Sequence, residues 1–239
     1  MAPVVLGLAR GGVPVGAEVA KALGWPLEVL VSTKIGAPAH EELGIGAVAE
    51  GLDSPVLTRL VERLHVGRGD LVVLYENAAA ELARRVRLYR AGRGLPELAG
   101  RHVVVVDDGM ATGVTAEAAL LAVRRHDPAW LAVAAPVCAR ETAERLACLA
   151  DEVVCARAPR DLGSVGAWYE DFSAVSDDDV LHAVGRAGAR LFGSPGQQPA
   201  RMGGRGLGGA EPVSPGARAG EDGDVPRRRL PGCAKEEAT

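Results

Sequence analysis

Residues 103–106 are four consecutive valines, and this run constrains the fold more than any other part of the chain. β-Branched side chains favour strands, and a strand without alternating polar residues is typical of a parallel sheet that is covered on both faces. Two carboxylates, Asp107 and Asp108, follow directly, and a short loop then leads into an alanine-rich segment, 116–125, that predicts a helix. A buried strand, a loop and a helix in this order predict an α/β fold.

The rest of the chain repeats this alternation. Apolar runs predict strands at 4–8, 27–33, 131–137 and 152–155, with a short strand or hairpin arm at 44–50. The spacing of apolar residues predicts helices at 13–23, 58–64, 71–89 and 140–149. We therefore expect residues 1–193 to form one domain with a doubly wound parallel sheet and a small hood. Residues 194–239 are rich in glycine and proline and contain no aromatic residue, which predicts a disordered tail.

The loop after the two carboxylates has the composition of an anion site. Amide N–H groups at the start of a helix lack partners within that helix, and the helix dipole adds to their attraction for an anion. Thr112 and Thr115 add hydroxyl donors, and Gly113 lets the backbone close around a phosphate. Asp107 and Asp108, expected to be exposed, would repel that phosphate and suit a sugar diol or Mg²⁺. An Asp-Gly turn with solvated acids that cap the helix is the alternative.

Residues 103–115 resemble the signature of type I phosphoribosyltransferases, which binds 5-phosphoribosyl-1-pyrophosphate (PRPP), although Gly109 and Val114 are less usual in that pattern. The resemblance implies that Asp107 and Asp108 hold the ribose hydroxyls, and hold Mg²⁺ directly or indirectly. The residues that it assigns to the phosphate loop are Ala111, Thr112, Gly113, Val114 and Thr115.

A second candidate anion loop follows the first predicted strand. Gly11 and Gly12 allow backbone amides to approach an anion, and Arg10 supplies a planar cation at the strand end where open α/β sheets bind ligands. The resemblance assigns this loop to the pyrophosphate of PRPP. A dinucleotide-binding loop and a tight turn without a ligand are the alternatives. The first is disfavoured because the pattern is not GxGxxG and because Lys34, not an acid, ends the second predicted strand.

Lys34 also opens a segment rich in glycine, proline and charge, 35–43, which we expect to be a loop. In type I phosphoribosyltransferases a mobile loop after this strand closes over the reacting centre, so the resemblance implies that Lys34 meets the pyrophosphate. An ordinary exposed loop with a solvated lysine is the alternative, and His40 is expected to be a surface residue.

Three aromatic residues, Trp168, Tyr169 and Phe172, gather beyond the last predicted strand. They could form a hood that stacks on an acceptor base, or a plug that packs under the last helix. Packing is favoured for Phe172, whereas Trp168 and Tyr169 stay open as acceptor-binding candidates. Ser176 is expected to cap the helix that follows.

The resemblance extends from about residue 4 to about residue 189 and is to a group of predicted bacterial phosphoribosyltransferases. Its motifs read Arg10-Gly11-Gly12, Lys34-Ile35-Gly36-Ala37-Pro38, Ala47-Val48-Ala49-Glu50, the central signature, and Trp168-Tyr169-Glu170-Asp171-Phe172. Ala9 replaces the usual proline, and the helical segment that normally precedes the first strand is missing, for which a truncated or misassigned start would account.

This resemblance implies a transfer of ribose 5-phosphate from PRPP to a nitrogen acceptor, with Mg²⁺ as cofactor and release of pyrophosphate. The catalytic residues that it implies are Asp107, Asp108, Arg10 and Lys34. The 6-oxopurine enzymes carry an aspartate at the position of Ala111, so the alanine disfavours hypoxanthine and guanine and resembles the adenine-type signature without proving adenine. The acceptor stays unidentified, with a nucleobase as one candidate.

Composition limits the other functions. The net charge is −4, which argues against a general nucleic-acid surface, and apolar runs are too short for a signal or a membrane span, so we expect a cytoplasmic protein. The cysteines have no CxxC or metal-ligand spacing and are interpreted as thiols in a reducing compartment. They are Cys138, Cys148, Cys155 and Cys233.

Two rival functions remain. A regulator that senses PRPP without catalysis would need the same anion loops, and the lack of a basic DNA-binding module counts against it. A different nucleotide-binding α/β protein is disfavoured because GxGxxG and Walker patterns are missing. The sequence leaves the oligomeric state open, a homodimer included.

Overall fold

The computed structural model of this chain describes residues 2–38 and 40–192, and the tail predicted at 194–239 lies outside these residues. Its central sheet has five strands, all parallel, in the order β2-β1-β6-β7-β8. These strands are β1 (Val4–Leu8), β2 (Leu27–Leu30), β6 (His102–Val106), β7 (Trp130–Val137) and β8 (Glu152–Arg157). The predicted doubly wound parallel sheet is confirmed.

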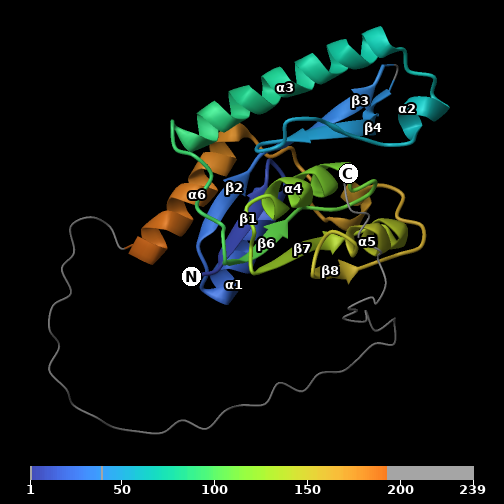
Figure 1. Cartoon of the computed structure of the whole chain (residues 1–239). Helices are drawn as coiled ribbons and strands as arrows, with labels where there is room; N and C mark the ends of the chain where they lie inside the picture. The colour runs from blue at the N-terminus through green and yellow to red at the C-terminus, as the bar shows by residue number, and fades with distance from the viewer. Residues whose placement is uncertain (1, 39, 193–239) are drawn as a thin grey trace, which may run out of the picture.

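Helices cover both faces of this sheet (Figure 1). The four valines of β6 require both layers of helices, because successive side chains of a strand point to opposite faces of the sheet. Val103 and Val105 are buried among residues of the helices α4 and α5, whereas Val104 and Val106 are buried among residues of α1 and α6. The helices are α1 (Gly12–Leu23), α4 (Val114–Arg124), α5 (Arg140–Leu146) and α6 (Asp177–Phe192).

A second, antiparallel sheet lies beside the first, with strands β3 (Ser32–Ala37), β4 (His40–Ala49) and β5 (Val56–Leu57). Two predictions were therefore wrong: the segment 27–33 is split between two sheets, and most of the expected loop 35–43 belongs to the strands β3 and β4 of a hairpin. Gly36 suits this hairpin because an added Cβ would lie 2.5 Å from the carbonyl oxygen of Glu41 on the facing strand. The glycine therefore permits close strand contact.

The hairpin layer, by which we mean β3, β4, β5 and the helix α3 (Arg68–Arg90), is packed on both sides (Figure 1). Ile35 and Ile45 are buried against α3, while Ala47 packs against Val114 and Ala118 of α4. A short helix, α2 (Leu60–Arg63), connects β5 to α3. None of the helices within 2–38 and 40–192 is both long and apolar enough to cross a membrane.

A buried ion pair between Glu50 and Arg90 joins the hairpin layer to the central sheet. The Arg90 Nη2 lies 2.6 Å from the Glu50 Oε1, and these side chains are 5% and 8% exposed. The same Arg90 nitrogen donates to the carbonyl of Val29 at 2.5 Å, and the N–H of Val31 donates to Glu50 at 3.0 Å. One ion pair thus fixes the ends of α3, β4 and β2 together.

The cysteine interpretation needs a correction. Cys138, directly after β7, and Cys155, in β8, form a disulfide with 6.1 Å between their Cα atoms. The two residues are 17 positions apart, and this spacing matches no local motif that would predict their pairing. They meet because β7 and β8 are neighbours in the sheet. The prediction that both are thiols was wrong.

Glu50→Ala should lower the free energy of unfolding by about 3–5 kcal/mol, because it leaves the buried Arg90 guanidinium without its counter-charge. Glu18→Ala is the matched control, because it removes the ion pair between Glu18 and Lys21, whose side chains are 74% and 58% exposed. This substitution should lower the free energy of unfolding by less than about 1 kcal/mol. Urea unfolding of both variants measures the difference. Equal effects would contradict the structural role of Glu50.

Candidate functional site

Two loops meet at the carboxyl edge of the central sheet. Strands β1 and β6 pair in parallel, with Gly7 opposite Val106, so the loops that follow them start side by side. The first loop carries Arg10, Gly11 and Gly12, and the second begins with Asp107. The structure therefore brings together the two segments that the sequence had predicted as anion loops.

The glycines of the first loop allow this approach. A Cβ added to Gly11 would lie 1.6 Å from the Oδ2 of Asp108, and a Cβ added to Gly12 would lie 2.3 Å from the carbonyl oxygen of Val106. A side chain at Gly12 would force the two loop backbones apart, and one at Gly11 would displace the carboxylate of Asp108. The glycines are predicted to face an anion, and the structure adds that Gly11 lies against the carboxylate of Asp108 and Gly12 against the backbone of Val106 and Asp107.

The two carboxylates are much less exposed than we had expected. Asp107 is 9% exposed, because its N–H still bonds to Ala134 of the next strand and the covered sheet continues to this residue. Burial raises the pKa of Asp107 well above its usual range, and the charge of Asp108 raises it further. Burial also raises the pKa of Asp108, against hydrogen bonds from backbone N–H groups. The pair therefore favours a positively charged partner.

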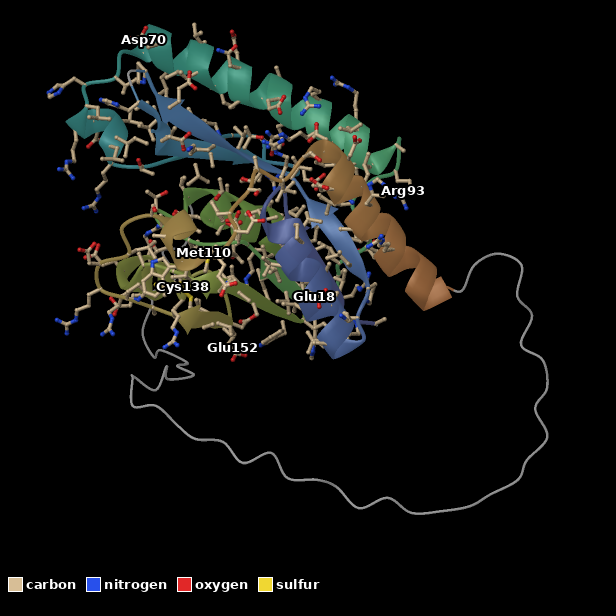
Figure 2. All side chains as sticks on the ribbon, turned by 180° about the vertical axis from the view of Figure 1, so that it is seen from behind. Glu18, Asp70, Arg93, Met110, Cys138 and Glu152 are labelled. Atoms are coloured by element: carbon tan, nitrogen blue, oxygen red, sulfur yellow. A yellow bond between two sulfur atoms is a disulfide. The ribbon has the colours of Figure 1, made fainter. Side chains whose placement is uncertain are left out.

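The predicted phosphate loop continues from the acid pair to the start of α4. Its first half is held by β7, because the N–H of Met110 bonds to Val137 and Met110 also bridges to Cys138 (Figure 2). Gly113 adopts a left-handed conformation with a φ of 66°, and an added Cβ would lie 2.3 Å from the Cγ2 of Thr142. Within residues 2–38 and 40–192, no acceptor bonds to the N–H groups of Ala111, Thr112 and Gly113.

Arg10 is half-buried, and within the described part of the chain no hydrogen bond or ion pair holds its guanidinium. Asp177, at the start of α6, is its electrostatic neighbour. Hydrogen bonds from Tyr89 and Arg84 lower the pKa of Asp177, and the charge of Arg10 lowers it further. This neighbour could not be predicted from local patterns, because 167 positions separate it from Arg10.

Lys34 lies within β3 rather than at the start of a loop, so this part of the prediction was wrong. Its ammonium group forms an ion pair with Glu42 at 3.1 Å and donates to the carbonyl of the same residue at 3.0 Å. The side chain still lies near the predicted phosphate loop, since a Cβ added to Gly44 would lie 3.3 Å from both Lys34 and Val114. Lys34 therefore borders the site with its charge already paired.

Tyr169 and Trp168 of the aromatic segment contact different parts of the structure. The hydroxyl of Tyr169 donates to the backbone carbonyl of Asp108 at 2.5 Å, and its ring lies 5.0 Å from the ring of Phe172. Burial, together with the charges of the acid pair, raises the pKa of Tyr169 to about 12. Trp168 instead donates to the carbonyl of Leu162 at 3.1 Å and is 44% exposed. The contacts bring Tyr169, and not Trp168, to the acid pair.

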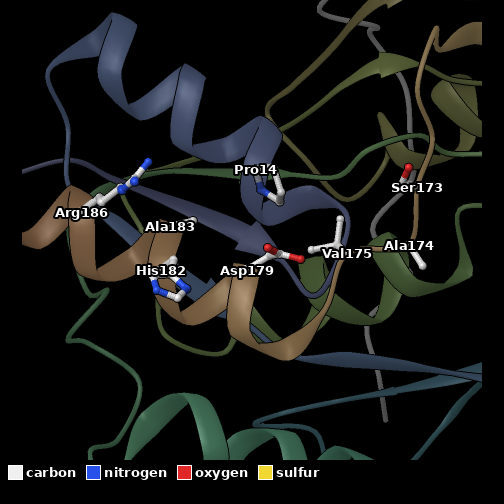
Figure 3. Close-up of a pocket in the computed structure, with 8 residues that line it drawn as sticks. All are labelled: Pro14, Ser173, Ala174, Val175, Asp179, His182, Ala183 and Arg186. Carbon is white, nitrogen blue, oxygen red and sulfur yellow. The ribbon is translucent and has the colours of Figure 1, made fainter.

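A cavity of about 380 Å³ lies between the start of α1, α6 and the segment before α6 (Figure 3). Its lining residues are Pro14, Ser173, Ala174, Val175, Asp179, His182, Ala183 and Arg186. The carboxylate of Asp179 already has a partner, because it accepts a hydrogen bond from the Ser176 hydroxyl at 2.6 Å. The same hydroxyl accepts the N–H of Asp179 at 3.1 Å. Ser176 thus caps α6 as predicted, and the cavity is a neighbour of the first loop.

The donor set at the acid pair fits Mg²⁺ that arrives with a phosphate substrate. Mg²⁺ prefers oxygen ligands and is commonly held by one or two carboxylates together with substrate phosphates and water. Asp107 and Asp108 supply two such carboxylates, and the residues described here contain no group of three or more ligating side chains that would form a site alone.

Residues 2–157 match the family model described as "Phosphoribosyl transferase domain". The chain belongs to this family. Its relatives include the protein named "Putative phosphoribosyl transferase Rv0571c" of Mycobacterium tuberculosis strain H37Rv, which is 41% identical over 186 residues. Its counterpart MT0597 in strain CDC 1551 is equally similar. The alignment covers 78% of this chain but only 42% of either relative, so this chain spans less than half of their length.

The fold of the family is also found among solved structures. The crystal structure of TT1426 from Thermus thermophilus is 43% identical to this chain, with a TM-score of 0.61. The similarity covers 77% of this chain and 87% of TT1426. The predicted membership of the phosphoribosyltransferase family is confirmed.

Asp107→Asn should raise the melting temperature near neutral pH, and the gain should shrink as the pH falls toward about 4. The folded-state pKa of Asp107 lies above its unfolded value, so its contribution to stability is present at low pH and is lost as the pH rises through the folded-state pKa. Asparagine keeps the Oδ1 that accepts the N–H of Asp108 at 3.0 Å and carries no charge.

Melting curves without divalent cations, recorded from about pH 4 to about pH 8, measure this effect. The control is Asp53→Asn, whose side chain is 86% exposed, and it should show no such trend. A gain for Asp107→Asn that did not change with pH would contradict the assigned effect of burial.

Proposed function

We propose that this chain catalyses Mg²⁺-dependent transfer of ribose 5-phosphate from PRPP to a nitrogen acceptor, with release of pyrophosphate. The observation that carries this proposal is the contact between Gly11 and the carboxylate of Asp108. It brings the loop of Arg10, whose guanidinium has no partner among the described residues, next to the loop that begins at Asp107 and contains the unpaired amides. The acid pair lies between the guanidinium and these amides. A substrate with a phosphate at one end, a pyrophosphate at the other and a diol between them fits this order.

The 5-phosphate is assigned to the loop from Ala111 to Thr115. Unpaired N–H groups at the start of α4 and the hydroxyls of Thr112 and Thr115 provide donors to its oxygens. This interaction fixes the ribose relative to the sheet edge. The ribose hydroxyls then reach Asp107 and Asp108.

Asp107 and Asp108 have two roles in this proposal. Their oxygens accept the ribose hydroxyls, and their negative charge stabilises the positive charge that develops on the ribose as its bond to pyrophosphate breaks. Their partial burial strengthens this effect, because a charge acts more strongly where water is excluded. Tyr169 holds the backbone of Asp108 through its hydroxyl.

Arg10 binds the leaving pyrophosphate, since its guanidinium has no partner among the described residues. Lys34 is the second cation assigned to this group, and it must exchange its bond to Glu42 for a bond to the substrate. Bound Mg²⁺, held by Asp107 and Asp108 together with substrate oxygens, would neutralise part of the pyrophosphate charge.

The acceptor belongs on the side of Tyr169, whose ring lies beside the acid pair and against Phe172. Trp168 is a weaker candidate for the same role because its contacts lead to Leu162. The absence of an acid at Ala111 still disfavours a 6-oxopurine. A cytoplasmic location and a homodimer remain predictions from the sequence.

Exchange of both carboxylates, Asp107→Asn with Asp108→Asn, should reduce turnover by at least about 100-fold while the protein stays folded, because the charge that stabilises the transition state is lost. Release of pyrophosphate from PRPP and Mg²⁺ with a panel of nucleobases and other nitrogen acceptors measures turnover, and circular dichroism checks the fold. Near-normal turnover by the folded double variant would contradict the role of the pair.

Lys34→Ala should depress turnover more than the affinity for PRPP, because the lysine must leave Glu42 to help the leaving group. Calorimetric titration with PRPP, run beside the turnover assay, separates the two effects. Tight Mg²⁺-dependent binding of PRPP by the wild type with no release stimulated by any acceptor would favour a sensor over an enzyme.

A further inference from the structure

Three successive carbonyl groups at the predicted phosphate loop accept hydrogen bonds from α5 or from the residue before it. The carbonyl of Met110 accepts the N–H of Ala139 at 2.9 Å, directly before α5. The carbonyl of Ala111 accepts the hydroxyl of Thr142 at 2.5 Å. The carbonyl of Thr112 accepts a guanidinium N–H of Arg145. All three acceptors therefore face α5 or the residue that leads into it.

This arrangement determines where the loop amides point. In a trans peptide unit the C=O of one residue and the N–H of the next point in opposite directions, and these peptide units are trans. Because the carbonyls of Ala111 and Thr112 face α5, the N–H groups of Thr112 and Gly113 face away from it. These are N–H groups that have no partner among the described residues. Successive N–H groups aimed the same way form an anion-binding concavity.

Both the methyl group and the hydroxyl of Thr142 contact the predicted phosphate loop. It is 5% exposed, and its Cγ2 lies against Gly113, where an added Cβ would come within 2.3 Å. Among the residues that the structure describes, its hydroxyl bonds to the carbonyl of Ala111 alone. A valine at this position would keep the shape and the packing on Gly113 but would lose the hydrogen bond.

Arg145 contributes a second effect through charge. Its guanidinium forms an ion pair with Glu117, which lies in the first turn of α4 and whose side chain is 24% exposed. An unpaired carboxylate there would repel a phosphate bound at the start of the same helix. Arg145 therefore both orients the carbonyl of Thr112 and offsets the charge of Glu117.

We propose that Thr142 and Arg145 are positioning residues for the phosphate loop: they bind its carbonyls so that its amides face the 5-phosphate. This inference rests on the proposed function, because it takes the loop as the site of that phosphate. Neither residue needs to touch the substrate. Local sequence patterns do not indicate these two residues, since they lie on α5, which follows β7 and not the strand that precedes the loop.

The test compares two ligands. Ribose 5-phosphate probes the phosphate loop, and Mg²⁺-pyrophosphate probes the loop of Arg10. Thr142→Val should weaken binding of ribose 5-phosphate roughly three- to tenfold, the effect of one lost hydrogen bond, and leave pyrophosphate binding unchanged. Thr142→Ser restores the hydroxyl and should restore the affinity. Calorimetry gives both affinities, and amide hydrogen exchange of Thr112 and Gly113 reports protection by ribose 5-phosphate directly.

Arg145→Gln gives a second, independent measurement. It should weaken ribose 5-phosphate binding more at low salt than at high salt, because part of the effect is the exposed charge of Glu117. Adding Glu117→Gln should recover part of the loss. Arg140→Gln removes the same charge from the same helix without any contact to the loop in the described structure, and it should bind as the wild type does.

The outcomes separate this inference from the proposed function. A wild type that binds neither ribose 5-phosphate nor PRPP overturns both. A wild type that binds ribose 5-phosphate, with folded Thr142→Val and Arg145→Gln variants that bind it equally well, overturns the positioning role alone. Equal weakening of both ligands, or no rescue by Thr142→Ser, would show a general structural effect and also overturns it.

Discussion

Gly11 and Asp108 touch so closely that a single added carbon at the glycine would overlap the carboxylate oxygen. The candidate site depends on this contact. It lets the loop after β1 lie against the loop after β6, and the parallel pairing of those two strands keeps both loops at one edge of the sheet. A cation, two carboxylates and a row of free amides are thereby brought to one place.

The elements around this edge hold the phosphate loop on two sides. On one side, α5 binds the carbonyls of Ala111 and Thr112. On the other, the hairpin layer packs on α4, and the hydroxyl of Ser32 donates to the carbonyl of Thr115 at 3.3 Å. The buried pair of Glu50 and Arg90 fixes that layer to the sheet. Apart from Lys34 in β3, the segments that support the site carry none of its predicted ligands.

Much of the fold could be predicted from local patterns. The valine strand, the loops and the helices that follow β1 and β6 were placed correctly, because strand propensity, helix periodicity and capping act over a few residues. The strand or hairpin arm expected at 44–50 is part of β4, but the hairpin's extent through 35–43 was missed because Gly36 and Pro38 are also typical of loops, and because burial of Ile35 and Ile45 against α3 stabilises the strands. The disulfide was missed for a similar reason, since strand order decides which cysteines meet.

The sequence by itself determined the chemistry that is available: the acid pair, the arginine and glycine loop, and the small residues at the start of α4. It also determined the family, through short motifs whose residues are adjacent in the chain. Only the tertiary structure decided that Asp107 is buried, that Lys34 is paired with Glu42, and that Tyr169 reaches the acid pair. These contacts join residues that are far apart in sequence or on different elements, and packing of the layers, not local preference, brings them within bonding distance.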